Sequence, residues 1–142
     1  MPQRSARAHW EGSIKDGGGS VAVESGTFDA RYSFGSRFEE GAGTNPEELL
    51  GAAHAGCFTM ALALGLTEAG HVPSRLDTTA RVTIERTSEG FRITRIDLEC
   101  EGEVPGIDES TFERVADGAK ANCPVSRALA GTQISLQAKL LG

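Results

Sequence analysis

The sequence has no excess of basic residues and few aromatic ones. Its 142 residues include 14 Lys and Arg against 20 Asp and Glu, giving a formal net charge of -6, and only 6% are aromatic. A nucleic-acid interface needs basic groups that neutralise phosphates, and often aromatic platforms on which bases stack. The composition therefore predicts no nucleic-acid partner, and it disfavours an anionic membrane surface for the same electrostatic reason.

The first twelve residues also lack the pattern of a signal peptide, because Arg4 and Arg7 are not followed by an apolar segment. We therefore expect a cytoplasmic protein. Only three cysteines are present. In that compartment cysteines rarely build a disulfide scaffold, and spaced ones are redox-active, metal-binding or simply buried.

One long segment, residues 49–67, contains no Asp, Glu, Lys or Arg. Its length is close to the minimum for a membrane span. Its many Ala and Gly residues, His54 in the middle and the acidic start at Glu47 and Glu48 argue against that interpretation. We predict no membrane partner, and instead a central helix that is apolar nearly all round and enclosed by the rest of the protein.

The order of the predicted elements indicates one α+β domain over residues 1–142 with an antiparallel sheet. Three short strands are expected between Ala6 and Phe34, followed by a loop. Asn45 as N-cap, Pro46 and Glu48 then mark the start of the long helix, which should end near Gly70. The later elements are a hairpin of strands 77–87 and 91–104, helices 108–122 and 125–130, and a last strand 133–141. Alternation in the second hairpin strand points Cys100 into the core.

The residues leave three interpretations of the remaining cysteines open. Cys57 in the long helix and Cys123 before Pro124 are either a nucleophile and its resolving partner, or two inert packing residues. In the third interpretation His54 and Cys57, which share a helix face, bind a metal together with Cys123. The lack of a CxxC motif or a further His-Cys pair disfavours the metal.

Two charged residues precede or begin the long helix. Arg37 is a candidate for stabilising a Cys57 thiolate, and Glu47 could orient the arginine through a bidentate pair. The alternative is that Arg37 is a solvated loop residue and that Glu47 only complements the helix dipole.

Two motifs, GTNPEELLGAAHAGCFTMAL and NCPVSRALAG, with the hairpin between them, resemble the OsmC/Ohr superfamily of osmotically inducible and organic hydroperoxide resistance proteins. The resemblance covers nearly the whole chain and is nearer to the OsmC branch. It implies an α+β fold made by an intertwined homodimer, with active sites at the dimer interface. It also implies a thiol peroxidase that reduces organic hydroperoxides without a cofactor and is recycled by a lipoyl-type or thioredoxin-type dithiol.

Residue roles follow from the same resemblance. Cys57 would be the peroxidatic thiol, Cys123 the resolving thiol, Arg37 the catalytic arginine and Glu47 its acidic partner. Cys100 matches no family motif and is expected to be structural.

We further expect an apolar collar that includes Phe38, Phe58 and Met60 and favours alkyl hydroperoxides over hydrogen peroxide. If Arg37 is not the catalytic arginine, Arg7 and Arg31 are the next candidates. The alternative to the enzyme is a non-catalytic stress protein that binds a small ligand or a metal.

Overall fold

The computed structural model describes all residues from Met1 to Gly142. They form two compact units, residues 1–49 and residues 50–142, which are treated separately below. The boundary falls inside the first turns of the long helix.

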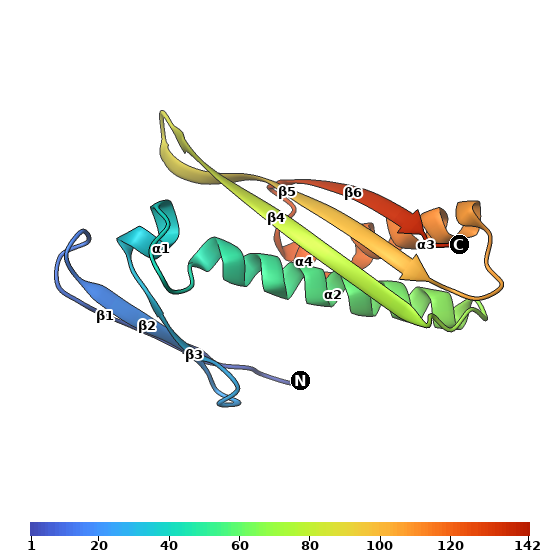
Figure 1. The fold of residues 1–142 in the computed structure, drawn as a ribbon, viewed down its shortest axis with the longest axis horizontal. Coiled ribbons are helices and arrows are strands. Elements are labelled where there is room, and N and C mark those ends of the chain that lie inside the picture. The colour runs from blue at the N-terminus through green and yellow to red at the C-terminus, as the bar shows by residue number, and fades with distance from the viewer. The chain divides into compact units, whose positions relative to one another are not determined.

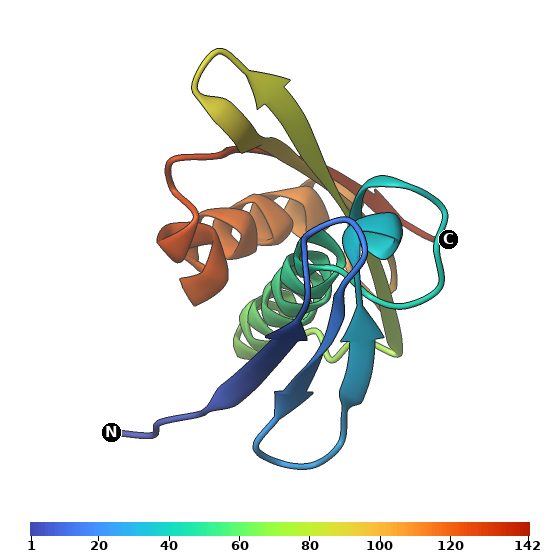
Figure 2. The ribbon, with the colours of Figure 1, turned by 90° about the vertical axis from the view of Figure 1, so that its left-hand side faces the viewer.

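Unit 1 contains a three-stranded antiparallel sheet, as predicted. Its strands are β1 (Ala6–Glu11), β2 (Gly18–Val23) and β3 (Asp29–Tyr32), in the order β1-β2-β3 (Figure 2). The Trp10 ring packs edge-on against Tyr32, with the ring centroids 5.3 Å apart.

A short helix follows where a loop was expected. It is α1 (Phe34–Phe38), and it forms because Ser33 and Ser36 complete a reciprocal capping box: each hydroxyl accepts a hydrogen bond from the other residue's backbone N–H. These two hydrogen bonds satisfy backbone N–H groups at the start of the helix that would otherwise have no partner in the helix. This helix presents Arg37.

The long helix α2 (Pro46–Glu68) begins where the sequence predicts. The Asn45 side chain accepts a hydrogen bond from the Glu48 backbone N–H at 2.7 Å, as an N-cap does. The Glu48 carboxylate, however, accepts from the Thr44 hydroxyl, so the second half of the predicted capping box is replaced. After the helix, Gly70 adopts a φ of 89°, which favours glycine.

Unit 2 places α2 beneath a second three-stranded sheet (Figure 1). Strands β4 (Arg75–Thr87) and β5 (Gly90–Glu103) form the predicted antiparallel hairpin. The last strand, β6 (Gln133–Leu140), pairs with β5 in parallel, so the prediction of a wholly antiparallel sheet is wrong. The reason is the connection between β5 and β6. Two helices lie between these strands and return the chain to the end of the sheet where β5 begins, so β6 runs in the same direction as β5.

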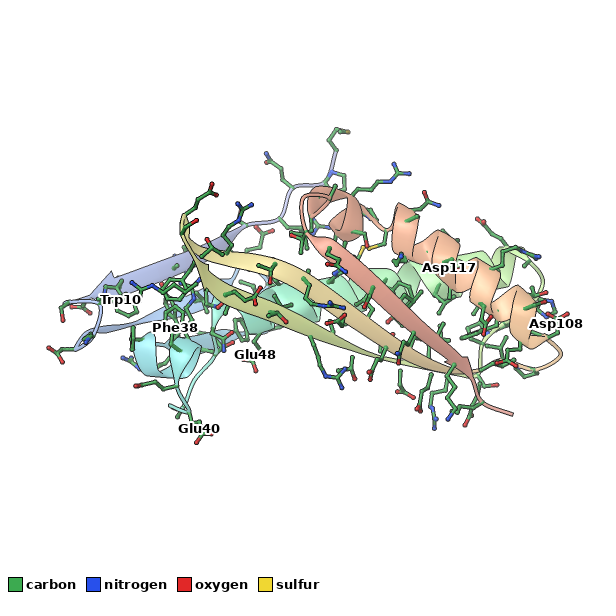
Figure 3. All side chains as sticks on the ribbon, turned by 90° about the horizontal axis from the view of Figure 1, so that it is seen from above. Trp10, Phe38, Glu40, Glu48, Asp108 and Asp117 are labelled. Atoms are coloured by element: carbon green, nitrogen blue, oxygen red, sulfur yellow. The ribbon has the colours of Figure 1, made fainter.

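Those two helices are α3 (Glu109–Asn122) and α4 (Pro124–Ala128). Asp108 caps α3 through the Thr111 backbone N–H, as predicted, and lies at its start (Figure 3). Helices α2 and α3 approach closely at Gly65, where an added Cβ would lie 2.8 Å from a Val115 methyl carbon. A larger residue at this position would push the two helices apart.

One face of α2 forms the core of unit 2 together with β5 and α3. Phe58, Leu62 and Leu66 are wholly buried there, and Cys100 points inward from β5 as predicted. The opposite face is open, because Met60 is 75% and Leu64 59% exposed. The single chain therefore does not enclose α2, which the sequence predicted to be enclosed by the rest of the protein. By length and composition alone α2 could cross a membrane, a test that the core helix of a soluble protein also passes.

Candidate active site

Two cysteines far apart in the sequence meet in unit 2. Cys57 projects from α2, and Cys123 lies at the junction of α3 and α4. Their side chains lie close enough for each thiol to affect the pKa of the other, and neither forms a disulfide. Cys57 is half-buried, whereas Cys123 is 0% exposed. Only Cys57 is therefore open to a molecule from solution.

The backbone at the helix junction fixes Cys123. Its N–H donates to the Ala119 carbonyl at 2.9 Å and closes α3, while its sulfur accepts the Ser126 backbone N–H at 3.3 Å and caps α4. Pro124 stands at the first position of α4, where its missing N–H costs nothing. Because Cys123 terminates one helix and begins the next, its sulfur is held in place beside Cys57.

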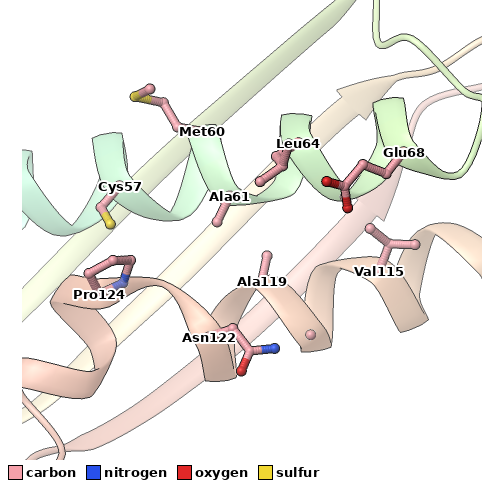
Figure 4. A pocket seen from close by; sticks show the side chains of 11 residues that line it. Cys57, Met60, Ala61, Leu64, Glu68, Val115, Ala119, Asn122 and Pro124 are labelled. Atoms are coloured by element: carbon pink, nitrogen blue, oxygen red, sulfur yellow. The ribbon is translucent and has the colours of Figure 1, made fainter.

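An apolar groove of about 1010 Å³ opens beside Cys57 and runs between α2 and α3. Met60 and Leu64 line one wall and Val115 lines the other, while the Cys57 sulfur points toward the turn at Pro124 (Figure 4). Of the predicted apolar collar, Met60 lies in this wall. Phe58 does not, because it is wholly buried in the core. Phe38 belongs to unit 1.

The two thiols differ in their tendency to ionise. Burial, together with the neighbouring Cys123 thiol, raises the pKa of Cys57 against the opposing effect of the Val125 backbone N–H. Burial also opposes ionisation of Cys123, but hydrogen bonds from the Ser126 hydroxyl and backbone N–H outweigh it and lower the pKa of Cys123. The hydrogen bonds from Ser126 therefore favour the ionised form of Cys123.

Unit 1 holds the predicted charged pair. Arg37 Nε donates to Glu47 Oε1 at 2.9 Å, and Arg37 Nη2 donates to Glu47 Oε2 at 3.1 Å. The Glu47 side chain is only 8% exposed and that of Arg37 is 37% exposed. The guanidinium also lies over the Phe38 ring, 5.1 Å from its centroid. The bidentate pairing that the sequence suggested is present, with the arginine partly open to solvent.

A third buried side chain approaches the cysteines. His54 on α2 is 0% exposed, and its Nε2 lies 2.7 Å from Ser126 Oγ. Sequence reasoning considered His54 as a metal ligand and did not single out Ser126. The available signal was Ser126 three residues after Cys123, the spacing of a helix cap to the third helical position.

The metal interpretation finds no support in the donor arrangement. No group of three or more His, Cys, Asp or Glu side chains is positioned to hold a metal ion. His54 Nε2 is instead engaged with Ser126.

The spacing of the two cysteines and the fold around them match one known family. A family model described as OsmC-like protein matches residues 39–138. The chain belongs to the OsmC-like family.

The sequences of OsmC-like relatives match most of the length of this chain. Peroxiredoxin OsmC of Escherichia coli (strain K12) is 54% identical over 127 residues, which is 89% of each protein. An organic hydroperoxide resistance protein of Xanthomonas axonopodis pv. citri (strain 306) is 34% identical over 64% of this chain and 63% of its own length.

A crystal structure of an organic hydroperoxide resistance protein OsmC from Legionella pneumophila superposes with a TM-score of 0.73. It is 23% identical and covers 100% of this chain and 98% of that one. The predicted OsmC-like α+β fold is thereby confirmed.

The OsmC-like relationship makes this chain a cysteine-based peroxidase. The residues matched by the family model include Glu47, Cys57 and Cys123, whereas Arg37 lies two positions before the matched range.

Proposed function

We propose that this OsmC-like protein reduces organic hydroperoxides to alcohols, with Cys57 as the peroxidatic thiol and Cys123 as the resolving thiol. The difference in access carries the proposal. Cys57 lines an apolar groove, whereas Cys123 is wholly buried but interacts with the Cys57 side chain. A substrate therefore reaches the first thiol, and the second is in place to react next.

The chemistry proceeds in two balanced steps. The Cys57 sulfur attacks the terminal oxygen of the hydroperoxide, the O–O bond breaks, and the alcohol leaves with the thiol proton. Cys57 is then a sulfenic acid. The Cys123 sulfur attacks the Cys57 sulfur, the S–O bond breaks, and one water is released as the disulfide forms. An external dithiol, lipoyl-type or thioredoxin-type, restores both thiols.

Arg37 supplies the positive charge that this mechanism needs. Burial raises the pKa of the Cys57 thiol, so a cation must favour its thiolate. The Arg37 guanidinium, oriented by two hydrogen bonds to Glu47, presents its remaining N–H groups to the peroxide oxygens. We propose that it acts on Cys57 in the assembled homodimer.

The substrate class follows from the groove wall. Met60, Ala61 and Leu64 offer apolar surface beside Cys57 and no hydrogen-bonding group. An alkyl or aryl chain gains free energy by leaving water there, at about 25 cal/mol per Å² of apolar surface buried. Hydrogen peroxide has no such surface, so organic hydroperoxides should be preferred.

One experiment tests the proposal: consumption of cumene hydroperoxide by the reduced protein, followed by intact mass. Wild type should consume one equivalent and lose two hydrogens. Cys57→Ser should consume none, because a hydroxyl has no accessible anion at neutral pH.

Cys123→Ser should still consume the first equivalent and gain one oxygen, which dimedone traps. Consumption by Cys57→Ser but not by Cys123→Ser would reverse the two roles. No consumption by wild type would favour the ligand-binding alternative.

A further inference from the structure

Three buried side chains form a continuous hydrogen-bonded chain behind the cysteine pair. Cys123 Sγ lies 3.4 Å from Ser126 Oγ, and Ser126 Oγ lies 2.7 Å from His54 Nε2. Cys123 and His54 are 0% exposed and Ser126 is 5% exposed. These hydrogen bonds join α2 to the junction of α3 and α4. The two-cysteine mechanism does not use Ser126 or His54.

The orientation of this chain follows from the unpartnered nitrogen of His54. The buried Nδ1 has no hydrogen-bond partner. A neutral imidazole carries one N–H, and a buried N–H without an acceptor is costly. We therefore assign the proton to Nε2, so that only a lone pair at Nδ1 is left unmatched. Nε2–H then donates to Ser126 Oγ, and the Ser126 hydroxyl donates to the Cys123 sulfur.

With this orientation two donors converge on one sulfur. Cys123 Sγ receives the Ser126 backbone N–H at 3.3 Å as well as the Ser126 hydroxyl. Hydrogen bonds to a charged group favour its charged form. The other titratable group in contact with this sulfur is the Cys57 thiol, and no charged side chain contributes to the lowered pKa of Cys123. Burial lowers the pKa of His54, which keeps its ring neutral.

We propose that Ser126 and His54 are positioning residues for the resolving step, holding Cys123 as an oriented thiolate that attacks the Cys57 sulfenic acid. The inference rests on the proposed function. In this step the new bond joins the two sulfurs and the S–O bond of Cys57 breaks. The departing hydroxide takes up the proton that Cys123 released when it ionised, so one water forms. Ser126 supplies two hydrogen bonds to the sulfur, and His54 keeps the serine hydroxyl turned toward it.

The first test separates the two chemical steps. Reduced protein receives one equivalent of tert-butyl hydroperoxide without any reductant, and hydroperoxide loss and disulfide formation are followed by rapid quench and intact mass. Ser126→Ala should leave hydroperoxide loss unchanged, slow disulfide formation about tenfold, and raise the fraction trapped by dimedone.

His54→Leu should slow the same step less, because the serine remains but its hydroxyl is no longer held. His54→Gln keeps an N–H close to the Nε2 position and should restore most of the rate. The matched control is Thr59→Val, which removes another half-buried hydroxyl of this unit, one that bonds Thr78.

The second test reads the thiolate directly and does not need turnover. Cys57→Ser, Cys100→Ala protein retains Cys123 as its one thiol, whose ultraviolet thiolate absorbance is titrated with and without Ser126→Ala. The apparent pKa should be higher without the serine hydroxyl.

The proposal is overturned if folded Ser126→Ala and His54→Leu proteins form the disulfide at the wild-type rate, or if the titration does not move. Failure of wild type to consume hydroperoxide would instead contradict the proposed function, and the titration would still test the hydrogen-bonded chain.

Discussion

Arg37 and Glu47 are joined by two parallel hydrogen bonds, with the carboxylate buried and the guanidinium partly open. The carboxylate is held by the start of α2, and the arginine is carried by the short helix α1. A buried carboxylate with one bidentate partner fixes the plane of the guanidinium. The arginine is thus preorganised before any ligand arrives.

Replacement of either partner should slow the oxidation of Cys57. Arg37→Met removes the charge and should lower the rate about 100-fold, because a preorganised charge-stabilising group is worth that much or more. Glu47→Gln leaves the arginine but loosens it, so the loss should be smaller. Single-turnover consumption of cumene hydroperoxide measures both rates.

Arg31→Met and Arg7→Met serve as controls, because these arginines are the other candidates near the N-terminus. Both should react at the wild-type rate. A large loss in either one, with Arg37→Met unaffected, would move the catalytic assignment to that residue.

Cys100→Ser should leave the peroxidase chemistry intact and weaken the fold. Cys100 points into the core from β5 and is 1% exposed, and burial raises the pKa of its thiol. A hydroxyl placed there costs about 1–3 kcal/mol if it finds no partner. Urea unfolding measures the loss, and Cys100→Ala is the control without a polar atom. Loss of disulfide formation in Cys100→Ala would mean that Cys100, not Cys123, is the resolving thiol.

The protein should be a dimer in solution. Met60 and Leu64 leave an apolar face of α2 exposed in the single chain, and a second copy is the partner that family membership suggests. Light scattering should give twice the 14.9 kDa chain mass. Leu64→Glu should shift the mass toward one chain, whereas Val72→Glu, at another exposed apolar residue, should not. A folded wild-type monomer at micromolar concentration would contradict the prediction.

Acid stability should depend on Asp97. Hydrogen bonds from Arg95 and Ser135 lower the pKa of this carboxyl to about 2, from an ordinary value of 3.8. Because the pKa is depressed in the folded state, the stabilisation is complete above the ordinary pKa and is lost as the pH falls through about 2. Asp97→Asn should therefore unfold at lower urea concentration at neutral pH and show a shallower decline over the acid range. Asp117→Asn, at an exposed position of α3, should keep the wild-type profile.

Local sequence patterns predicted the long helix, its start and most of the strands, but not the short helix α1. Contacts between residues far apart in the sequence were harder to predict. Asn45 and Pro46 mark a helix start by chemistry within one turn, so the boundary was correct to the residue. The Arg37 and Glu47 pair spans ten positions and could be inferred from complementary chemistry. Ser126 meets His54 across 72 positions, and no pattern in one sequence encodes such a contact. The direction of β6 likewise depends on where the crossover helices return the chain.

The parallel pairing of β6 also constrains how the chain folds as it is synthesised. The hairpin of β4 and β5 can form as soon as both strands have emerged, but the free edge of β5 must wait for the last strand. During that interval the edge carries unpaired backbone groups, which can recruit strands from other chains. Truncation before Gln133 should leave this edge open permanently, so the shortened chain should aggregate during expression although Cys57 and Cys123 are both present.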